Sequence, residues 1–455
     1  MKFGVLILAL LAIFPLSLLL RSTPMLRKPF WFTFGALPFF ASAVPLFDVG
    51  IISWAGSWIG FVYALQISII DILAAAAFFA MPPRGKLPLW CKLPFLLYLL
   101  AASLSLFQAS EPVAASFGVM QFARIYLVMV VVARAVRDDP EVPFLIMKGM
   151  ALGIFAHFVA VLYQRFELNL PQTMGLFIHQ NTLGMAAHFV IFPHLALLLA
   201  GHRSPGSLLA IVGATAIVII FTASRAAVGF AAFGVVLLFA MQALAGLTGR
   251  KMSIAFLGLA TLLVVVPLAV STFSNRFETN PLGESVYDER AAFNRAASFI
   301  LEDHPLGVGI NHYVHVARDF GYSDKAGVIA FEGNRNNIVH SAYWLTAAEA
   351  GYPGLVTFVI MLAVPALAAL RTGWRMRHTL EGSLLLGFFV ALTVVYLHSA
   401  YEWVIFAREI QYLLVMTMGM AMGLVLAFKA RAPARRALVA APRREVRGHA
   451  LNHQP

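Results

Sequence analysis

Residues 226–247 read AAVGFAAFGVVLLFAMQALAGL and contain no charged side chain. A helix needs about 20 apolar residues to cross the hydrocarbon core of a bilayer, and this segment is long enough to do so. Similar apolar stretches recur along the whole chain, at 3–20, 30–47, 58–80, 94–110, 113–133, 142–163, 180–200, 207–223, 252–271, 342–370, 383–401 and 409–428. The sequence therefore predicts an all-α polytopic membrane protein with about 12–13 transmembrane helices.

The composition of the whole chain agrees with this class. Of the 455 residues, 60% are hydrophobic and only 12% are charged, and the mean hydropathy is +0.82. Soluble domains carry about 25% charged residues, and one core could not hide so large an apolar surplus. These values exclude a soluble globular domain. The single cysteine, Cys91, also excludes an internal disulfide framework and a multi-cysteine metal site.

The net charge of +12 would suggest nucleic acid in a soluble protein, but here it follows the rule that cytoplasmic loops are cationic. Lys and Arg cluster on alternate connections, near residues 21–28, 84–92, 134–137, 203, 250–251, 371–377 and 429–447. We expect this side to be cytoplasmic, with the bilayer and not nucleic acid as partner. Residues 1–20 lack a small-residue cleavage site before Arg21, which predicts an uncleaved anchor.

Five regions follow from this orientation. Residues 1–174 and 175–271 are predicted transmembrane helices, and the second group carries an Asn-Thr and a Ser-Arg motif. Residues 272–340 form one large periplasmic loop, and helical spacing within it predicts a partly helical lid. Residues 341–428 are the C-terminal transmembrane helices. Residues 429–455 are a basic cytoplasmic tail, expected to be disordered against anionic lipid.

Two arginines on the predicted outer side stand out. Arg225 follows Ser224 at a turn between two apolar spans, and Arg290 opens the predicted lid helix, about one turn before Arg295. A guanidinium binds two phosphate oxygens at once, which makes these arginines candidate ligands of a diphosphate. The alternative for each is an ordinary paired or snorkelling arginine.

Arg124 lies inside the predicted span 113–133. A charged side chain at that depth is costly and tends to mark a functional site or a buried pair. Asp71, in the span 58–80, is the possible partner of such a pair. Both readings remain open from the sequence.

Histidine is the second signal on the predicted outer side. The imidazole can act as a base near neutral pH without unusual tuning. His340 lies where the long loop re-enters the membrane, and His312 is another outer-face candidate. At the membrane boundary a base could meet both a lipid-linked and a soluble reactant.

Several motifs are missing. The chain has no GxxxxGK[ST] loop for ATP, no HExxH zinc motif and no acidic DxD motif on an outer loop. We therefore predict no metal and no cofactor. Arginines would have to stabilise the developing charge, which favours a diphosphate leaving group.

Four blocks of sequence, in order, resemble the O-antigen ligase and O-antigen polymerase superfamily of bacterial membrane glycosyltransferases. They are GLFIHQNTLG at 175–184, TASRAA at 222–227, RAAFN at 290–294 with DHPLGVG at 303–309, and HSAY at 340–343 with EAGYPG at 349–354. The resemblance covers about residues 175–358. Asn294 and Ser341 depart from it, since the family usually has Trp and Asn at these places.

The resemblance implies transfer of a glycan from undecaprenyl diphosphate to an acceptor hydroxyl, at the periplasmic face of the bacterial inner membrane. The acceptor would be lipid A core. By the same resemblance Arg225 and Arg290 would bind the diphosphate, and His340 would be the catalytic base. Direct attack would invert the anomeric centre. The possible accessory residues are Arg124, Arg295, Asn181, His312 and Tyr343.

Other functions stay open at this point. An O-antigen or exopolysaccharide polymerase would use the same donor, with another carrier-linked glycan as acceptor, and transfer to protein hydroxyls is more distant. A polysaccharide flippase or secondary transporter is the rival from another class. Transporters often contain two corresponding halves, and this sequence has no internal repeat. A scaffold protein would not need arginines on the outer side.

Overall fold

The computed structural model describes residues 2–43, 48–53, 58–81, 85–170, 172–202, 204–217, 222, 224–260, 263 and 288–440. Nine helices within these ranges are long and apolar enough to cross a membrane. They are α1 (Lys2–Ser22), α4 (Leu89–Leu104) with its extension η4 (Ser105–Gln108), α5 (Pro112–Asp138), α6 (Val142–Phe166), α7 (Gln180–Ala200), α9 (Arg225–Leu244), α15 (Ala342–Arg375), α16 (Leu380–His398) and α17 (Arg408–Ala440). These helices confirm the predicted all-α polytopic membrane class.

Three other predicted spans form shorter helices. For 30–47, α2 (Arg27–Ala36) passes into the 3-10 turn η2 (Leu37–Phe40). For 58–80, only α3 (Ile69–Ala80) is helical, because β2 (Ala64–Ser68) pairs antiparallel with β1 (Asp48–Ser53). For 207–223, α8 (Pro205–Ala216) covers the first part, and 218–221 and 223 lie outside the described residues. Most of 261–287 also lies outside them.

A local signal explains why the helix of the third stretch begins late. Ser68 and Asp71 form a capping box, in which the Ser68 side chain accepts from the backbone of α3 and Asp71 accepts from the Ser68 N–H. This arrangement satisfies backbone donors at a helix start and leaves the preceding residues free to extend as a strand. The predicted span 58–80 is hydrophobic over most of its length, so its hydropathy did not predict where the helix begins.

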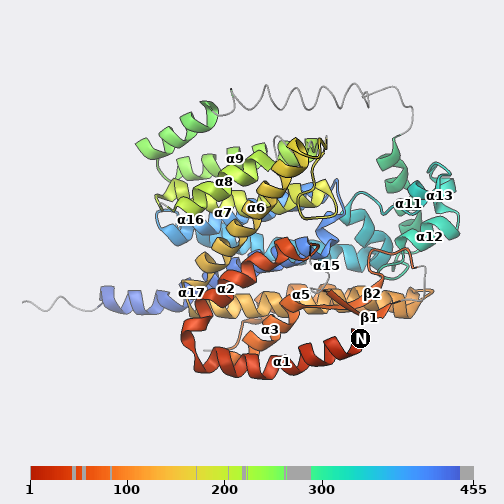
Figure 1. Ribbon diagram of the computed structural model, residues 1–455, viewed down its shortest axis with the longest axis horizontal. Coiled ribbons are helices and arrows are strands. Elements are labelled where there is room, and N and C mark those ends of the chain that lie inside the picture. The colour runs from red at the N-terminus through yellow and green to blue at the C-terminus, as the bar shows by residue number, and fades with distance from the viewer. Residues whose placement is uncertain are drawn as a thin grey trace, which may run out of the picture.

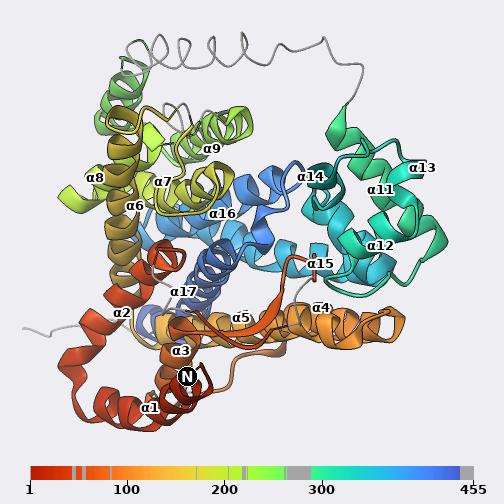
Figure 2. The same cartoon turned by 45° about the vertical axis from the view of Figure 1, so that its right-hand side comes forward.

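The long helices lie side by side, and the short helices of the loop gather at one end of the bundle (Figure 1). That lid consists of α11 (Glu289–Asp303), α12 (Tyr313–Asp319), α13 (Tyr322–Lys325) and α14 (Glu332–Arg335). The last part of α17 leaves the bundle at the opposite end (Figures 1 and 2). This helix continues to Ala440 and not only to 428, because Ala and Arg favour helix. Residues 441–455 lie outside the described ranges.

The lid is attached to the bundle by backbone contacts between two of the sequence blocks. The N–H groups of Val308 and Gly309 donate to the carbonyls of Ala348 and Glu349, at 3.1 and 2.9 Å. Gly351 interrupts the helical dihedrals of α15 with φ +66°, and a Cβ there would lie 2.3 Å from the Pro305 carbonyl oxygen. Only glycine allows both this backbone conformation and this approach.

We expect Gly351→Ala to lower the free energy of unfolding by about 1–3 kcal/mol through backbone strain, and to loosen the lid. Gly229→Ala is the matched control, because a Cβ at that position in α9 meets nothing within 4 Å. It should be neutral or slightly stabilising. Thermal unfolding of the purified variants, with proteolysis of the lid as second readout, checks this. Equal unfolding temperatures for both variants would contradict it.

Candidate active site

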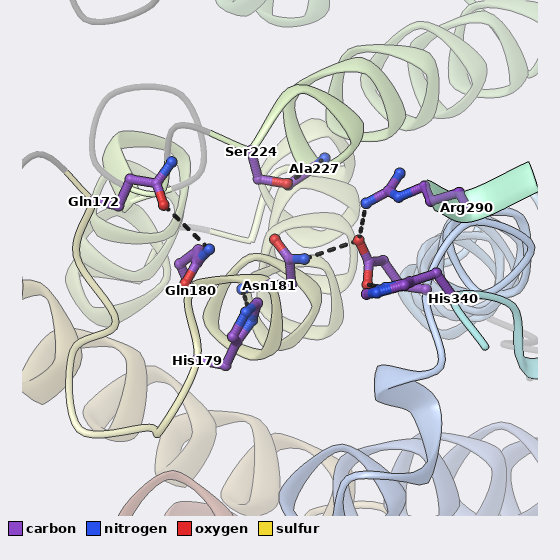
Figure 3. Close-up of polar contacts among 9 residues, drawn as sticks. Gln172, His179, Gln180, Asn181, Ser224, Ala227, Arg290 and His340 are labelled. Carbon is purple, nitrogen blue, oxygen red and sulfur yellow. Dashed lines mark hydrogen bonds and ion pairs between the residues drawn. The ribbon is translucent and has the colours of Figure 1, made fainter. Parts of the chain in front are cut away.

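A buried carboxylate joins three residues that are far apart in the sequence. Glu402 lies in the turn between α16 and α17, and its side chain is 3% exposed. Its Oε1 accepts from Arg290 Nη2 at 2.7 Å and from Asn181 Nδ2 at 2.8 Å. Its Oε2 lies 3.5 Å from His340 Nδ1. Figure 3 shows Arg290, Asn181 and His340 directed toward this common point.

Each of the three residues comes from a different element. Asn181 lies in the first turn of α7 and Arg290 in the first turn of α11, whereas His340 lies two residues before the start of α15. Ser341 caps α15, and the Ala342 N–H donates to the Ser399 carbonyl at 2.9 Å. This bond fixes the start of α15 against the turn that carries Glu402. The cluster therefore forms where α7, α11, α15 and the α16–α17 turn meet.

The surroundings of Glu402 keep its carboxyl ionised. Burial by itself would raise the pKa of Glu402, but the hydrogen bond from His340 and the positive charge of Arg290 outweigh it. The pKa of Glu402 is therefore lowered below its ordinary value. An ionised carboxylate only accepts hydrogen bonds, so His340 Nδ1 must be the donor. The other ring nitrogen, Nε2, is then the one able to accept a proton.

His179 extends the cluster on the side of α7. It caps this helix, and its Nδ1 accepts from the Asn181 N–H at 3.1 Å. Burial is the main cause that lowers the pKa of His179, with the Glu402 charge opposing it and His340 adding to it. His179 is therefore a neutral acceptor that orders the turn carrying Asn181.

Arg225 is the first residue of α9, and its side chain is exposed. The start of α9 packs on the start of α7, because a Cβ on Gly184 would lie 2.9 Å from the Ala227 Cβ. Asn181 is one turn before Gly184. Ser224 caps α9 through a hydrogen bond from the Ala227 N–H at 3.4 Å. Packing of the two helix starts thus brings Arg225 to the end of the bundle that holds the cluster.

Arg124 belongs to a separate network. Its Nη1 donates to Asp71 Oδ2 at 3.0 Å, and the Tyr412 hydroxyl donates to Asp71 Oδ1 at 2.8 Å. The Arg124 and Asp71 side chains are only 10% and 8% exposed. The sequence left two interpretations of Arg124 open, a functional site or a buried ion pair. The structure contains the ion pair with Asp71, and this network connects α3 to α5 and α17.

We expect Asp71→Ala to destabilise the protein by about 3–5 kcal/mol, because it leaves the buried Arg124 charge uncompensated. Thermal unfolding in detergent measures the effect. Lys28→Ala is the control, since the Lys28–Glu141 pair is 67% and 60% exposed and should contribute little. An unfolding temperature for Asp71→Ala close to that of the control variant would contradict the structural role.

The remaining predicted accessory residues make structural contacts outside the Glu402 cluster. Arg295 donates through Nε and Nη2 to the Ala326 carbonyl and so joins α11 to α13. His312 is buried, which lowers its pKa to about 4, and its Nε2 accepts from the Glu111 N–H at 3.1 Å. The Tyr343 hydroxyl donates to the Tyr396 carbonyl at 3.0 Å.

Sequence reasoning missed Glu402. Glu402 lies in a short turn between two strongly apolar helices. Its position between Tyr401 and Trp403 on the predicted outer side was the available signal. A lone acidic residue in such a turn is costly unless it is paired.

Within the described residues, no group of three or more His, Cys, Asp or Glu side chains is arranged to hold a metal ion. The polar groups of the cluster are instead one carboxylate, one guanidinium, one amide and one imidazole. Searches of this chain against models of protein families and against curated proteins find no match.

Proposed function

We propose that this chain is a membrane glycosyltransferase that moves a glycan from undecaprenyl diphosphate to an acceptor hydroxyl at the periplasmic face of the inner membrane. One observation carries the proposal: Arg290, His340 and Asn181 meet at the buried Glu402 carboxylate. Arg290, which can bind phosphate, and His340, which can accept a proton, both contact Glu402 at the end of the bundle. The sequence resemblance adds the substrate class.

In the proposed reaction His340 Nε2 takes the proton of the acceptor hydroxyl. The hydroxyl oxygen forms a bond to the anomeric carbon while the bond from that carbon to the diphosphate breaks. The electron pair of the broken bond leaves with the lipid diphosphate. Glu402 orients the imidazole and stabilises its protonated form, although the 3.5 Å separation would have to shorten when substrate binds. One such displacement inverts the anomeric configuration.

Arg290 suits the charge that develops on the leaving group. Its Nη2 is held by Glu402, yet the side chain is 49% exposed, so the rest of the guanidinium is available to an incoming diphosphate. Arg225 would be the second cation, at the N-terminus of α9, where the helix dipole also favours negative charge. Preorganised donors of this kind are worth about 10²–10³ in rate each.

The acceptor divides the proposal into two forms. An O-antigen ligase would use lipid A core, and an O-antigen or exopolysaccharide polymerase would use a second carrier-linked glycan. Both forms need the same donor site, and the Glu402 cluster serves either. A flippase or secondary transporter is the alternative of another class, and it would need no proton acceptor beside the arginine.

The test is transfer by the purified full-length protein in liposomes. Carrier-linked glycan is supplied with either lipid A core or further carrier-linked glycan, and the products are separated and sequenced by mass spectrometry. We expect one acceptor to be consumed, with inversion at the new linkage. Arg318→Ala, which removes a partly exposed lid arginine that pairs with Asp319 and donates to Asn336, is the control and should remain active. Retention of configuration, or transport of glycan without transfer, would refute the proposal.

A further inference from the structure

A second site lies at the end of the bundle away from the lid. There a cavity of about 380 Å³ is lined by residues of α2, α3 and α5 and by the α5–α6 turn. Helix α5 starts beside the lid, where the Glu111 N–H donates to His312. It is 27 residues long and ends at Asp138 on the cavity wall. Figure 1 shows α5 running between these two ends.

Two arginines, Arg27 and Arg134, line this cavity, and neither forms an ion pair with a carboxylate within the described residues. Arg134 makes neither a hydrogen bond nor an ion pair there, and its guanidinium carbon lies 4.6 Å from the centre of the Phe78 ring. Arg27 donates from Nε to the Leu20 carbonyl at 3.1 Å and from Nη2 to the Arg21 carbonyl at 3.5 Å. Carbonyl contacts leave the charge of Arg27 in place.

The acidic residues of the wall offset only part of this charge. Asp138 is paired with Arg137, at 2.8 Å to Nε. Asp139 accepts the Glu141 N–H at 2.9 Å and carries one negative charge. The lining itself carries two arginines and two aspartates, and Arg137, which pairs with Asp138 from outside the lining, brings the sum of these five charges to +1. This net charge is equal and opposite to the single negative charge of a phosphodiester.

The rest of the lining is apolar. Trp31, Ala77, Phe78, Met81 and Val131 form the part of the wall between the helices. These residues lie near the end of apolar helices, the level at which a bilayer changes from headgroup to hydrocarbon. A small soluble anion would gain nothing from such a wall, but a lipid glycerol and its first methylenes would.

We propose that this cavity binds the phosphate of a membrane phospholipid. The planar guanidinium of Arg134 donates two hydrogen bonds to the phosphate oxygens, and Arg27 adds a second positive charge. The glycerol lies along Phe78 and Met81. Since the cavity is separate from the Glu402 cluster, this inference does not depend on the proposed reaction.

The test measures binding by the full-length protein after delipidation in detergent. Phosphatidylglycerol is added and followed by native mass spectrometry and by thermal unfolding, beside parallel samples with diacylglycerol or inorganic phosphate. We expect one retained phosphatidylglycerol per chain and a higher unfolding temperature, and neither effect with the other two additives. Arg134→Gln should weaken lipid binding about tenfold or more. Arg371→Gln, an exposed cation of the last turns of α15, should not.

Three results would overturn the inference. Undiminished lipid binding by Arg134→Gln would remove the cavity as the site. Equal stabilisation by inorganic phosphate would make it a soluble-anion site, and equal stabilisation by diacylglycerol would make it a purely apolar one. If Arg134→Gln fails to fold, Arg134→Lys decides, because it keeps the charge but loses the planar fork and should bind measurably more weakly.

Discussion

His340→Ala is expected to lower glycan transfer by about 10²–10⁴-fold while leaving donor binding nearly unchanged, because it removes the proton acceptor and not the phosphate ligands. His340 Nδ1 faces Glu402 Oε2, so Nε2 is the atom available to the acceptor hydroxyl. Transfer is measured with purified protein and carrier-linked glycan, and donor binding by equilibrium titration. The loss should fall on turnover rather than on donor affinity.

The matched control is His315→Ala. His315 also lies in the lid, but it pairs with Asp319 and does not belong to the Glu402 cluster. We expect this variant to keep most of the activity. If His340→Ala transfers glycan at the normal rate, His340 is not the base. If it also moves glycan across the membrane as well as the unaltered protein, the flippase alternative gains support.

Glu402→Gln should reduce turnover by about 10²-fold or more, although Glu402 itself touches neither substrate in the proposed reaction. The amide keeps the size of the side chain but removes the charge that holds both Arg290 and His340. The imidazole would lose its fixed tautomer and the stabilisation of its protonated form. Arg290 would lose its 2.7 Å anchor and could place the diphosphate poorly.

Glu402 is thus a positioning residue, and its test needs a readout beyond activity. Glu402→Asp keeps the charge and should recover part of the turnover that Glu402→Gln loses, and thermal unfolding of both variants separates this effect from a loss of stability. Glu332→Gln, an exposed carboxylate of the lid, is the control. Equal loss of turnover in Glu402→Asp and Glu402→Gln, with equally lowered stability, would mean that the carboxylate only supports the fold.

Much of the fold followed from composition and periodicity. Nine predicted spans are long apolar helices, since lipid demands such helices whatever their neighbours. The boundaries that failed depend on local hydrogen bonds, such as the Ser68–Asp71 capping box, which hydrophobicity does not record. The shorter α2 has a similar cause, because the chain turns into a 3-10 segment at Leu37.

The candidate site, like the fold, was predicted from the sequence only in part. The sequence by itself determined which residue types were available. Arg290 and His340 stood out because charge and imidazole are conspicuous in an apolar chain, and Asn181 stood out through the resemblance of its motif. Only the tertiary structure decided that they converge, that Glu402 joins them and that Arg124 belongs to Asp71 instead. Such convergence depends on how segments that lie 62 to 221 residues from Glu402 in the sequence pack together. A single sequence carries no direct record of that packing.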